Sequence, residues 1–287
     1  MDETQGHFSA ISGHGNMCIA NLTRLSRVEF QIESAPYNNE ITCLRGNGAS
    51  MMTSDGSLRS MSRTAGIYYL GTIITGVFAA FFAIGDVMVS RDAAATAVNL
   101  VASESLYRWG IAAELASALC YVGVTCYFFE IFKLVDRRLS LLAAMMSLTG
   151  SAVLAGNTLN LIAPLLLLSG AEYLAPLPTD QVQALSLFFL KLHGYGYATC
   201  LIFFGFYCLL IGYLIIKGKQ VPVAIGLAMI LGGLSYLLLS IADIVSPALY
   251  EILPAYTTVT ALIAELALCL WLIMFGVNTK QDMKETE

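Results

Sequence analysis

The chain has little charge and few of the residues that build soluble catalytic or metal sites. Of its 287 residues, only 12% are Asp, Glu, Lys or Arg, and only three are histidine. A soluble domain is typically about 25% charged and about 45–50% apolar. Here 57% of the residues are hydrophobic and the mean hydropathy is +0.72. This composition excludes an ordinary soluble domain and indicates a polytopic membrane protein.

Sequence motifs for the common chemistries are also missing. There is no GxxxxGK[ST] loop for a nucleoside triphosphate, no HExxH zinc pair, and no CxxC pair among the seven cysteines. No basic block suggests nucleic-acid binding. His193, the one histidine in the apolar part of the chain, cannot by itself supply the paired ligands of a membrane haem. We therefore expect no enzyme activity, no metal, no cofactor and no nucleic-acid partner.

The first 61 residues lack sustained periodicity and the apolar core of a signal peptide. They contain YNNE, RGNGAS and TSDGS, so we expect a disordered polar leader over residues 1–61. A second interpretation is that translation begins at Met51, Met52 or Met61 and that the leader is absent from the native protein. The rest of the chain divides into a transmembrane domain over residues 62–278 and a cytoplasmic tail over residues 279–287.

Apolar runs of about 20 residues, the length that crosses about 30 Å of hydrocarbon as a helix, recur after the leader. They predict an all-α helix bundle with six membrane spans, at about Gly66–Val89, Trp109–Phe132, Leu139–Leu168, His193–Ile216, Val221–Val245 and Tyr256–Val277. The third run is too long for one straight span, and Pro164 is expected to break its far end. Before the fourth run, Thr179 or Asp180 is placed to cap a short helix, which either lies on the membrane surface or extends that span.

The loop charges predict how the bundle is oriented. Nine Lys or Arg residues flank the runs on one side, whereas only Arg91, Arg108 and Lys191 flank them on the other. Because loops rich in Lys and Arg stay in the cytoplasm, both termini are predicted to be cytoplasmic. The chain is then a multi-pass protein of the cell membrane whose partner is the lipid bilayer.

Two carboxylates lie inside these apolar runs, where they are costly. Glu265 lies in TALIAELALCLWLIMF (260–275), and Glu114 lies in the similar GIAAELASALCYVGV (110–124). With a rise of about 1.5 Å per residue, Glu265 is within about 3 Å of the predicted midplane and Glu114 is roughly 9 Å outside it. A carboxylate near the bilayer centre costs about 2.5–3.5 kcal/mol. Glu265 is therefore predicted to face the bundle interior, where it is protonated, hydrogen-bonded, or paired with Lys191 or His193.

Further polar residues gather in the same outer half of the predicted bundle. We hypothesise a polar pocket that opens to the outside, lined by Glu265 and Glu114, with Asn157, Asn160, His193 and Asp243 near its mouth. Asn157 and Asn160 are three residues apart and share one helix face. Because burial disfavours the charged form of a carboxyl group, Glu265 is the candidate proton-binding residue. The alternative is that these groups only hydrogen-bond one another and hold the helices together.

Several pieces of the chain resemble the bacterial domain-of-unknown-function 4386 family. They are SRTAGIYYLGTIITGVFA, DAAATAVNLVASESLYRWGIAAEL, HGYGYATCLIFFGFYCLLIGYLI, GLAMILGGLSYLLLSIAD and AELALCLWLIMFGV, and they are spread over about residues 62–278. The resemblance implies an integral membrane protein, and the family supplies no activity or residue role to carry over.

The residues thus predict an integral membrane protein that binds or transports a small molecule or ion, with proton linkage through buried carboxylates. The alternative is a non-catalytic structural or accessory membrane protein. The sequence specifies neither the ligand nor the oligomeric state.

Overall fold

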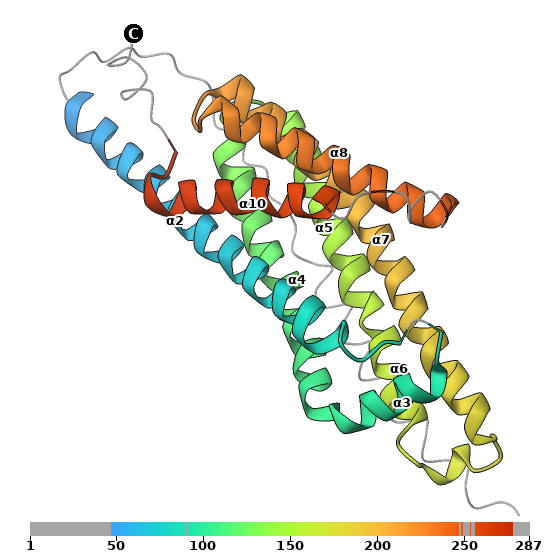
Figure 1. Cartoon of the computed structure of the whole chain (residues 1–287). Coiled ribbons are helices and arrows are strands. Elements are labelled where there is room, and N and C mark those ends of the chain that lie inside the picture. Colours follow the sequence, from blue (N-terminus) through green and yellow to red (C-terminus); the bar gives the residue numbers. More distant parts are fainter. Residues whose placement is uncertain (1–46, 90, 247, 249–252, 254–255, 278–287) are drawn as a thin grey trace, which may run out of the picture. The chain divides into compact units, whose positions relative to one another are not determined.

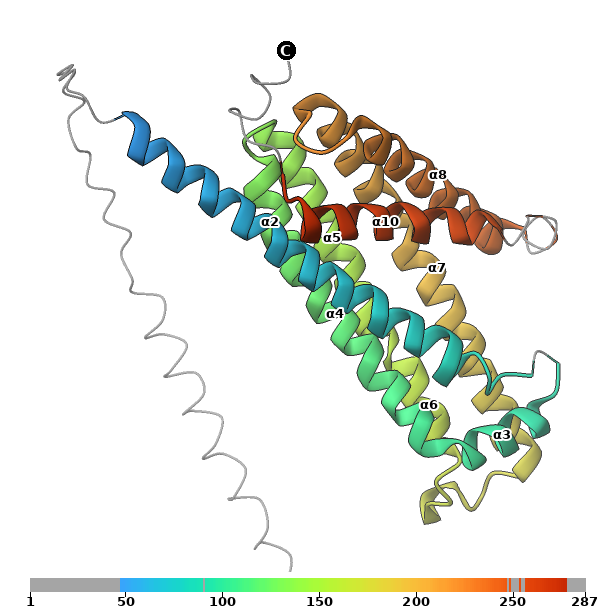
Figure 2. The ribbon, with the colours of Figure 1, turned by 60° about the vertical axis from the view of Figure 1, so that its left-hand side comes forward.

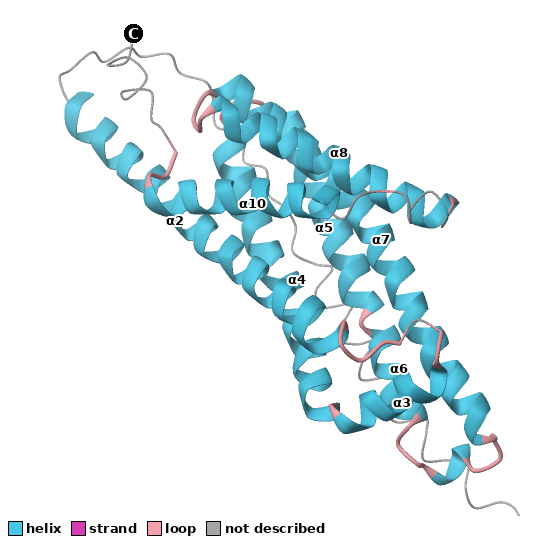
Figure 3. Ribbon diagram, in the orientation of Figure 1, coloured by secondary structure: helices cyan, strands magenta, loops and turns pink. Residues whose placement is uncertain are grey.

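The computed structural model describes residues 47–89, 91–246, 248, 253 and 256–277. Contacts divide the chain into Met1–Gly46 and Asn47–Glu287, and all of the described residues belong to the second unit. Every regular element among them is helical (Figure 3). The predicted tail and most of the predicted leader lie outside the described residues.

The helices are shown along the chain in Figure 1. In order they are α2 Asn47–Val77, the π-helix η1 Phe78–Ile84, α3 Ala93–Ala102, α4 Glu104–Phe132, α5 Arg137–Asn157, α6 Leu159–Leu167, the 3-10 turn η2 Glu172–Leu174, α7 Thr179–Gly218, α8 Val223–Val245 and α10 Tyr256–Met274.

Five stretches of the described chain are long and apolar enough to cross a membrane. They are Gly56–Ile84, Glu104–Phe132, Arg137–Leu167, Thr179–Gly218 and Val223–Val245. Helices suit this environment because they satisfy their backbone hydrogen bonds within one segment. The prediction of an all-α membrane helix bundle is therefore confirmed. α10 contributes a shorter apolar stretch, Val259–Met274, so a sixth span at this helix stays a prediction.

The long helices of the described chain pack in a closed ring. α2 packs against α4, α4 against α5, α5 against α7, α7 against α8, α8 against α10, and α10 packs back against α2. Figures 1 and 2 show α2, α4, α5 and α7 running alongside one another, while α10 lies at a steep angle to α2 and meets it with its C-terminal end. Side chains from all of these helices can therefore meet inside the ring.

α7 and α8 approach each other through reciprocal glycine contacts. A Cβ atom on Gly212 would lie 2.6 Å from the carbonyl oxygen of Gly226, and one on Gly233 would lie 2.7 Å from that of Gly205. Small residues at such positions let helices in lipid pack backbone against backbone. This contact fixes α8, and with it Tyr236, against the face of α7 that lines the ring.

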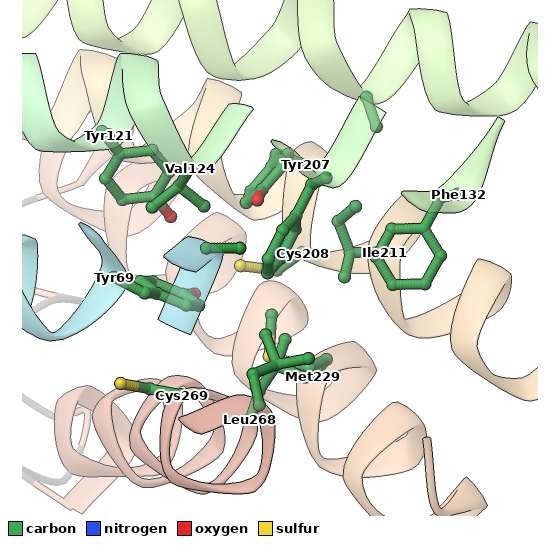
Figure 4. Packing of buried hydrophobic residues seen from close by; sticks show 14 of the residues in the cluster. Tyr69, Tyr121, Val124, Phe132, Tyr207, Cys208, Ile211, Met229, Leu268 and Cys269 are labelled. Carbon is green, nitrogen blue, oxygen red and sulfur yellow. The ribbon is translucent and has the colours of Figure 1, made fainter. Parts of the chain in front are cut away.

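The core inside the ring is rich in aromatic side chains. Tyr69 from α2 packs edge to face against Tyr121 and Phe128 from α4, with ring centroids 5.8 and 5.9 Å apart. Tyr207 from α7 stacks on Phe128 at 6.5 Å. Figure 4 shows Tyr69, Tyr121 and Tyr207 in this core, where side chains from α2, α4, α7, α8 and α10 converge. Such ring pairs contribute about 0.5–1.5 kcal/mol beyond their area burial.

The ends of two elements differ from those predicted. α2 begins at Asn47, so residues 47–61 of the predicted leader are helical. No proline interrupts them, and extending an existing helix adds hydrogen bonds without a new nucleation cost. The Thr179–Gly218 helix follows the predicted alternative that extends the fourth span, but Pro178 lies at its N-cap and no side chain caps it.

The interruption of the third span also lies elsewhere than predicted. Pro164 lies inside α6, and the break falls earlier, at Thr158 between α5 and α6. A proline has no N–H and crowds the carbonyl four residues before it, so it disturbs the helix on its N-terminal side. The Thr158 hydroxyl donates to the carbonyl of Ala155 at 2.7 Å and helps to satisfy the broken turn.

Candidate functional site

Glu265 lies on α10 and faces the inside of the helix ring, with only 8% of the residue exposed. Tyr121 on α4 donates to one carboxylate oxygen at 3.4 Å, and Tyr236 on α8 donates to the other at 3.3 Å. Cys208 on α7 donates a weak S–H bond at 3.7 Å. Hydroxyl–carboxylate bonds are usually about 2.5–2.7 Å long. The donors therefore surround the carboxylate without holding it tightly.

Two further tyrosines beside Glu265 have hydroxyl groups that the described residues do not satisfy. Tyr69 and Tyr207 are at most 1% exposed, and neither hydroxyl has a hydrogen-bond partner there. Tyr69 lies close enough to interact electrostatically with the Glu265 carboxylate but does not form a well-directed hydrogen bond. Figure 4 shows Tyr69, Tyr121 and Cys208 pointing toward the same part of the core. A buried polar group left unpaired costs about 1–3 kcal/mol. Each of these two hydroxyls can therefore gain stability from a further hydrogen-bond partner beside Glu265.

Glu265 lines a cavity of about 180 Å³, which we call the inner cavity. Its walls come from α2, η1, α4, α5, α7, α8 and α10. Among aliphatic and small residues, the lining includes five aromatic side chains, which are Phe81, Tyr121, Tyr197, Phe204 and Tyr236. Val259 of α10 lines it as well. A single carboxylate thus faces a space whose walls include several aromatic side chains.

The second buried carboxylate has a basic partner. Glu114 Oε1 lies 3.0 Å from His193 Nε2, which joins α4 to α7. Both residues are buried, at 5% and 9% exposure. Ser117 and Tyr121 lie three and seven residues after Glu114, so α4 presents all three side chains on one face. This helix therefore contributes to both carboxylate sites.

Two asparagines, one on α5 and one on α6, are hydrogen-bonded to the backbone of His193 directly or through each other. Asn157 donates its side-chain amide to the His193 carbonyl at 2.9 Å, and Asn160 donates to Asn157 Oδ1 at 2.9 Å. Gly196 on α7 leaves the room for this contact, because a Cβ there would lie 2.0 Å from Asn157 Oδ1. The result is a chain of hydrogen bonds that ties α4, α7, α5 and α6 together.

Glu114, His193 and Asp243 line a second space of about 370 Å³, the outer cavity. The inner and outer cavities share a wall that includes Ser117, Tyr197 and Tyr236. The two cavities therefore adjoin inside the ring, with Glu265 at one and the Glu114–His193 pair at the other.

The predicted site residues thus divide among three places. Glu265 lines the inner cavity, Glu114, His193 and Asp243 line the outer cavity, and Asn157 and Asn160 line neither but brace His193. Lys191 is exposed and His193 pairs with Glu114. Pairing of Glu265 with either residue, one of the states predicted for it, is therefore not observed, and its neighbours are neutral donors instead.

The closest partners of Glu265 were not identified from the sequence. Tyr121 and Tyr236 did carry a signal, since a tyrosine inside an apolar run needs a partner for its hydroxyl. Cys208 carried none, because a free cysteine behaves as a small hydrophobe. In the described part of the chain, no three His, Cys, Asp or Glu side chains are grouped so as to hold a metal ion.

The fold and the two cavities define an integral membrane helix bundle with carboxylates buried inside it. Comparison with known families identifies the group to which it belongs. The family described as "Domain of unknown function (DUF4386)" matches residues 64–276, so the chain is a member of that family. No curated protein and no solved structure matches the chain.

Proposed function

We propose that this protein binds a small solute or ion in the two adjoining cavities and carries it across the cell membrane with proton linkage at Glu265. The observation that supports this most is a carboxylate, 8% exposed, that lines a cavity and has only neutral hydrogen-bond donors. A buried charge is costly unless it is paired. Glu265 can relieve that cost either by taking up a proton or by binding a cation.

The surroundings of Glu265 favour proton exchange over a fixed ion pair. The titratable groups that face it are Tyr69 from α2, Tyr121 from α4, Tyr197, Tyr207 and Cys208 from α7, Tyr236 from α8, and Cys269 from its own helix. Tyrosine and cysteine side chains are ordinarily uncharged at pH 7. None of the ion pairs between described residues involves Glu265.

A purely structural role is the second candidate, and the outer cavity supplies the observation that favours it. Glu114, His193, Asn157 and Asn160 form a continuous set of hydrogen bonds across four helices. Groups that satisfy one another in this way can hold a bundle together without binding anything. The two candidates differ in what they require of Glu265, which has no such chain of partners.

A thermal-stability screen of the detergent-solubilised protein separates the two candidates. We would compare a panel of ions and metabolites from pH 5 to 8 for wild type, Glu265→Gln and the matched control Glu130→Gln. Glu130 is a half-exposed glutamate that pairs with Lys133 at the cytoplasmic end of α4 in the predicted orientation. A ligand at 100 times its Kd adds about 2.7 kcal/mol of stability.

A stabilising ligand whose effect is lost in Glu265→Gln and kept in Glu130→Gln supports the proposed function. If no member of the panel stabilises the wild type and Glu265→Gln is equally stable at every pH, the structural role is favoured instead. On this proposal the bundle has six spans with both termini in the cytoplasm, and it carries out no catalysis.

A further inference from the structure

We propose that the inner cavity takes monovalent organic cations with an apolar body, as in substituted ammonium ions. This inference rests on the proposed function and names the ligand class of the same site. It is carried by the combination of one buried carboxylate, aromatic walls and a rim on the outer surface of the bundle.

The charge of the cavity calls for a single positive group. An ionised Glu265 brings one negative charge into the ring, and its hydrogen-bond partners Tyr121, Tyr236 and Cys208 bring none. Their long contacts leave the carboxylate oxygens open to a stronger partner. A bound monovalent cation would neutralise the carboxylate and leave no net charge in the cavity.

The aromatic walls favour an organic cation over a metal ion. Besides Phe81, four aromatic residues line the cavity together with Glu265: Tyr121, Tyr197, Phe204 and Tyr236. The ring centroids of Tyr121 and Phe204 are 4.4 Å apart, so these two rings form one continuous aromatic wall. The face of an aromatic ring attracts an ammonium group within about 6 Å of its centre. A divalent ion such as calcium instead takes about six to eight oxygen ligands, and the described residues group no such set of carboxylates here.

The size of the cavity and its apolar opening at the bundle surface favour a ligand with an apolar body. Ligand sites usually enclose about 300–1,000 Å³, and the inner cavity of about 180 Å³ adjoins the outer one of about 370 Å³. Phe81 on η1 and Val259 on α10 line the inner cavity although they are 63% and 49% exposed. The cavity therefore reaches the apolar outer surface between η1 and α10, where an amphiphilic cation partitioned into the bilayer can enter.

Cation binding and proton binding compete for the same carboxylate on this proposal. When the cation enters, one proton leaves a protonated Glu265, so that the net charge of the cavity is unchanged. Binding should therefore be weaker at pH 5 than at pH 8, because a higher proton concentration favours the protonated carboxyl group.

Benzyltrimethylammonium is a suitable probe, and neopentylbenzene is its uncharged analogue of the same shape. We would titrate both into the detergent-solubilised protein by calorimetry at pH 5 and 8, and would follow the proton release in weak buffer. The variants are Glu265→Gln, which removes the charge, and Phe204→Leu, which removes an aromatic face. Phe188→Leu is the matched control, because Phe188 lies on the same helix, is exposed and lines neither cavity.

We expect the cation to bind more tightly at pH 8 than at pH 5, with up to one proton released per cation bound. Its affinity should fall about 100-fold or more in Glu265→Gln, which loses a desolvated charge pair. It should fall about tenfold in Phe204→Leu, and it should be unchanged in Phe188→Leu. If Glu265→Gln does not fold, the proton release and the Phe204→Leu titration still decide the question.

Equal binding of the neutral analogue, or cation binding that is indifferent to pH and to Phe204, would overturn the inferred ligand class. The proposed function would survive that result if another ligand from the stability screen depends on Glu265. It fails separately if no ligand of any class shows such dependence.

Discussion

A buried carboxylate can be satisfied by a basic group or by neutral donors, and Glu114 and Glu265 differ in this respect. Glu114 has the imidazole of His193 at 3.0 Å, whereas Glu265 has two hydroxyls and a thiol at 3.3 to 3.7 Å. The same Ala-Glu-Leu setting in the sequence therefore leads to two kinds of site. One is held by its partner, and the other is open to exchange.

The Glu114–His193 pair predicts a pattern of stability in single and double variants. Removing one partner of a buried hydrogen bond leaves the other polar group unsatisfied, which costs about 1–3 kcal/mol and more for a charged group. Glu114→Leu or His193→Leu alone should therefore lower the Tm strongly, while the double variant should recover most of the loss. Thermal unfolding of the four proteins in detergent measures this. Additive losses in the double variant would show that the two side chains act independently.

A second prediction concerns Gly196, where adding a single methyl group is expected to disturb the packing. A Cβ at this position would lie 2.0 Å from Asn157 Oδ1, so Gly196→Ala must displace the asparagine from the His193 carbonyl. We expect a loss of about 1–3 kcal/mol from overpacking. Gly194→Ala is the control, since nothing lies within 4 Å of a Cβ there. Equal Tm values for the two variants would contradict the proposed role of Gly196.

Sequence reasoning at this scale identified the buried carboxylates but not their partners. Glu114 and Glu265 were found because a charge in an apolar run is costly wherever it lies. Which side chain meets it depends on how α4, α7, α8 and α10 cross, and a hydrophobic run does not encode those crossings. Of the three states predicted for Glu265, the structure shows the hydrogen-bonded one, while His193 pairs with Glu114 instead. Tyr236, on a different helix, was not identified as a partner.

Asp136 joins two helices at the end of the bundle that the loop charges place in the cytoplasm. It caps α5 by accepting from the backbone N–H groups of Arg138 and Leu139, both at 3.1 Å, and it accepts from Lys217 of α7 at 2.7 Å. The Lys217 hydrogen bond, followed by that from the Leu139 N–H, holds the pKa of Asp136 below its usual range. A carboxyl group whose pKa is lowered by folding contributes stability above its unfolded pKa.

Asp136→Asn should therefore lower the Tm at pH 7, although asparagine keeps the capping acceptor. The difference from wild type should shrink as the pH falls below about 4, where the unfolded carboxyl group binds a proton, and should vanish below the folded pKa. Unfolding in detergent from pH 7 to pH 3 measures this difference, and Lys217→Gln should show the same trend. A difference that stays constant over that range would exclude the ion pair as its source.

Helices were predicted well where the length of an apolar run sets their ends. They were predicted less well where local backbone geometry or capping sets them. The second and fifth runs end at Phe132 and Val245, as predicted, because the apolar segments stop there. The π-helix η1 and the short helix α3 were not predicted. α3 depends on the Asp92 cap, which accepts from the Ala95 N–H at 2.9 Å, and such local contacts give only a weak signal in sequence.

For the whole molecule, composition was sufficient to establish the membrane class, because the length of an apolar run has to match the bilayer. The two cavities could not be derived in the same way. They depend on the ring in which α10 packs back against α2 and closes the space around Glu265. The role of that residue therefore depends on whether α10 crosses the membrane.

Reporter fusions test this crossing. Alkaline phosphatase is active only outside the cytoplasm, whereas green fluorescent protein folds and fluoresces inside it. The loop charges predict phosphatase activity for fusions after Asp92, Glu172 and Ala248, and fluorescence for fusions after Asp136, Lys219 and Glu287. The pair at Ala248 and Glu287 is decisive, because these junctions flank α10. Opposite signals there would place Glu265 at membrane depth, as proton-linked transport requires. Matching signals would leave five spans and put its carboxylate at the membrane surface.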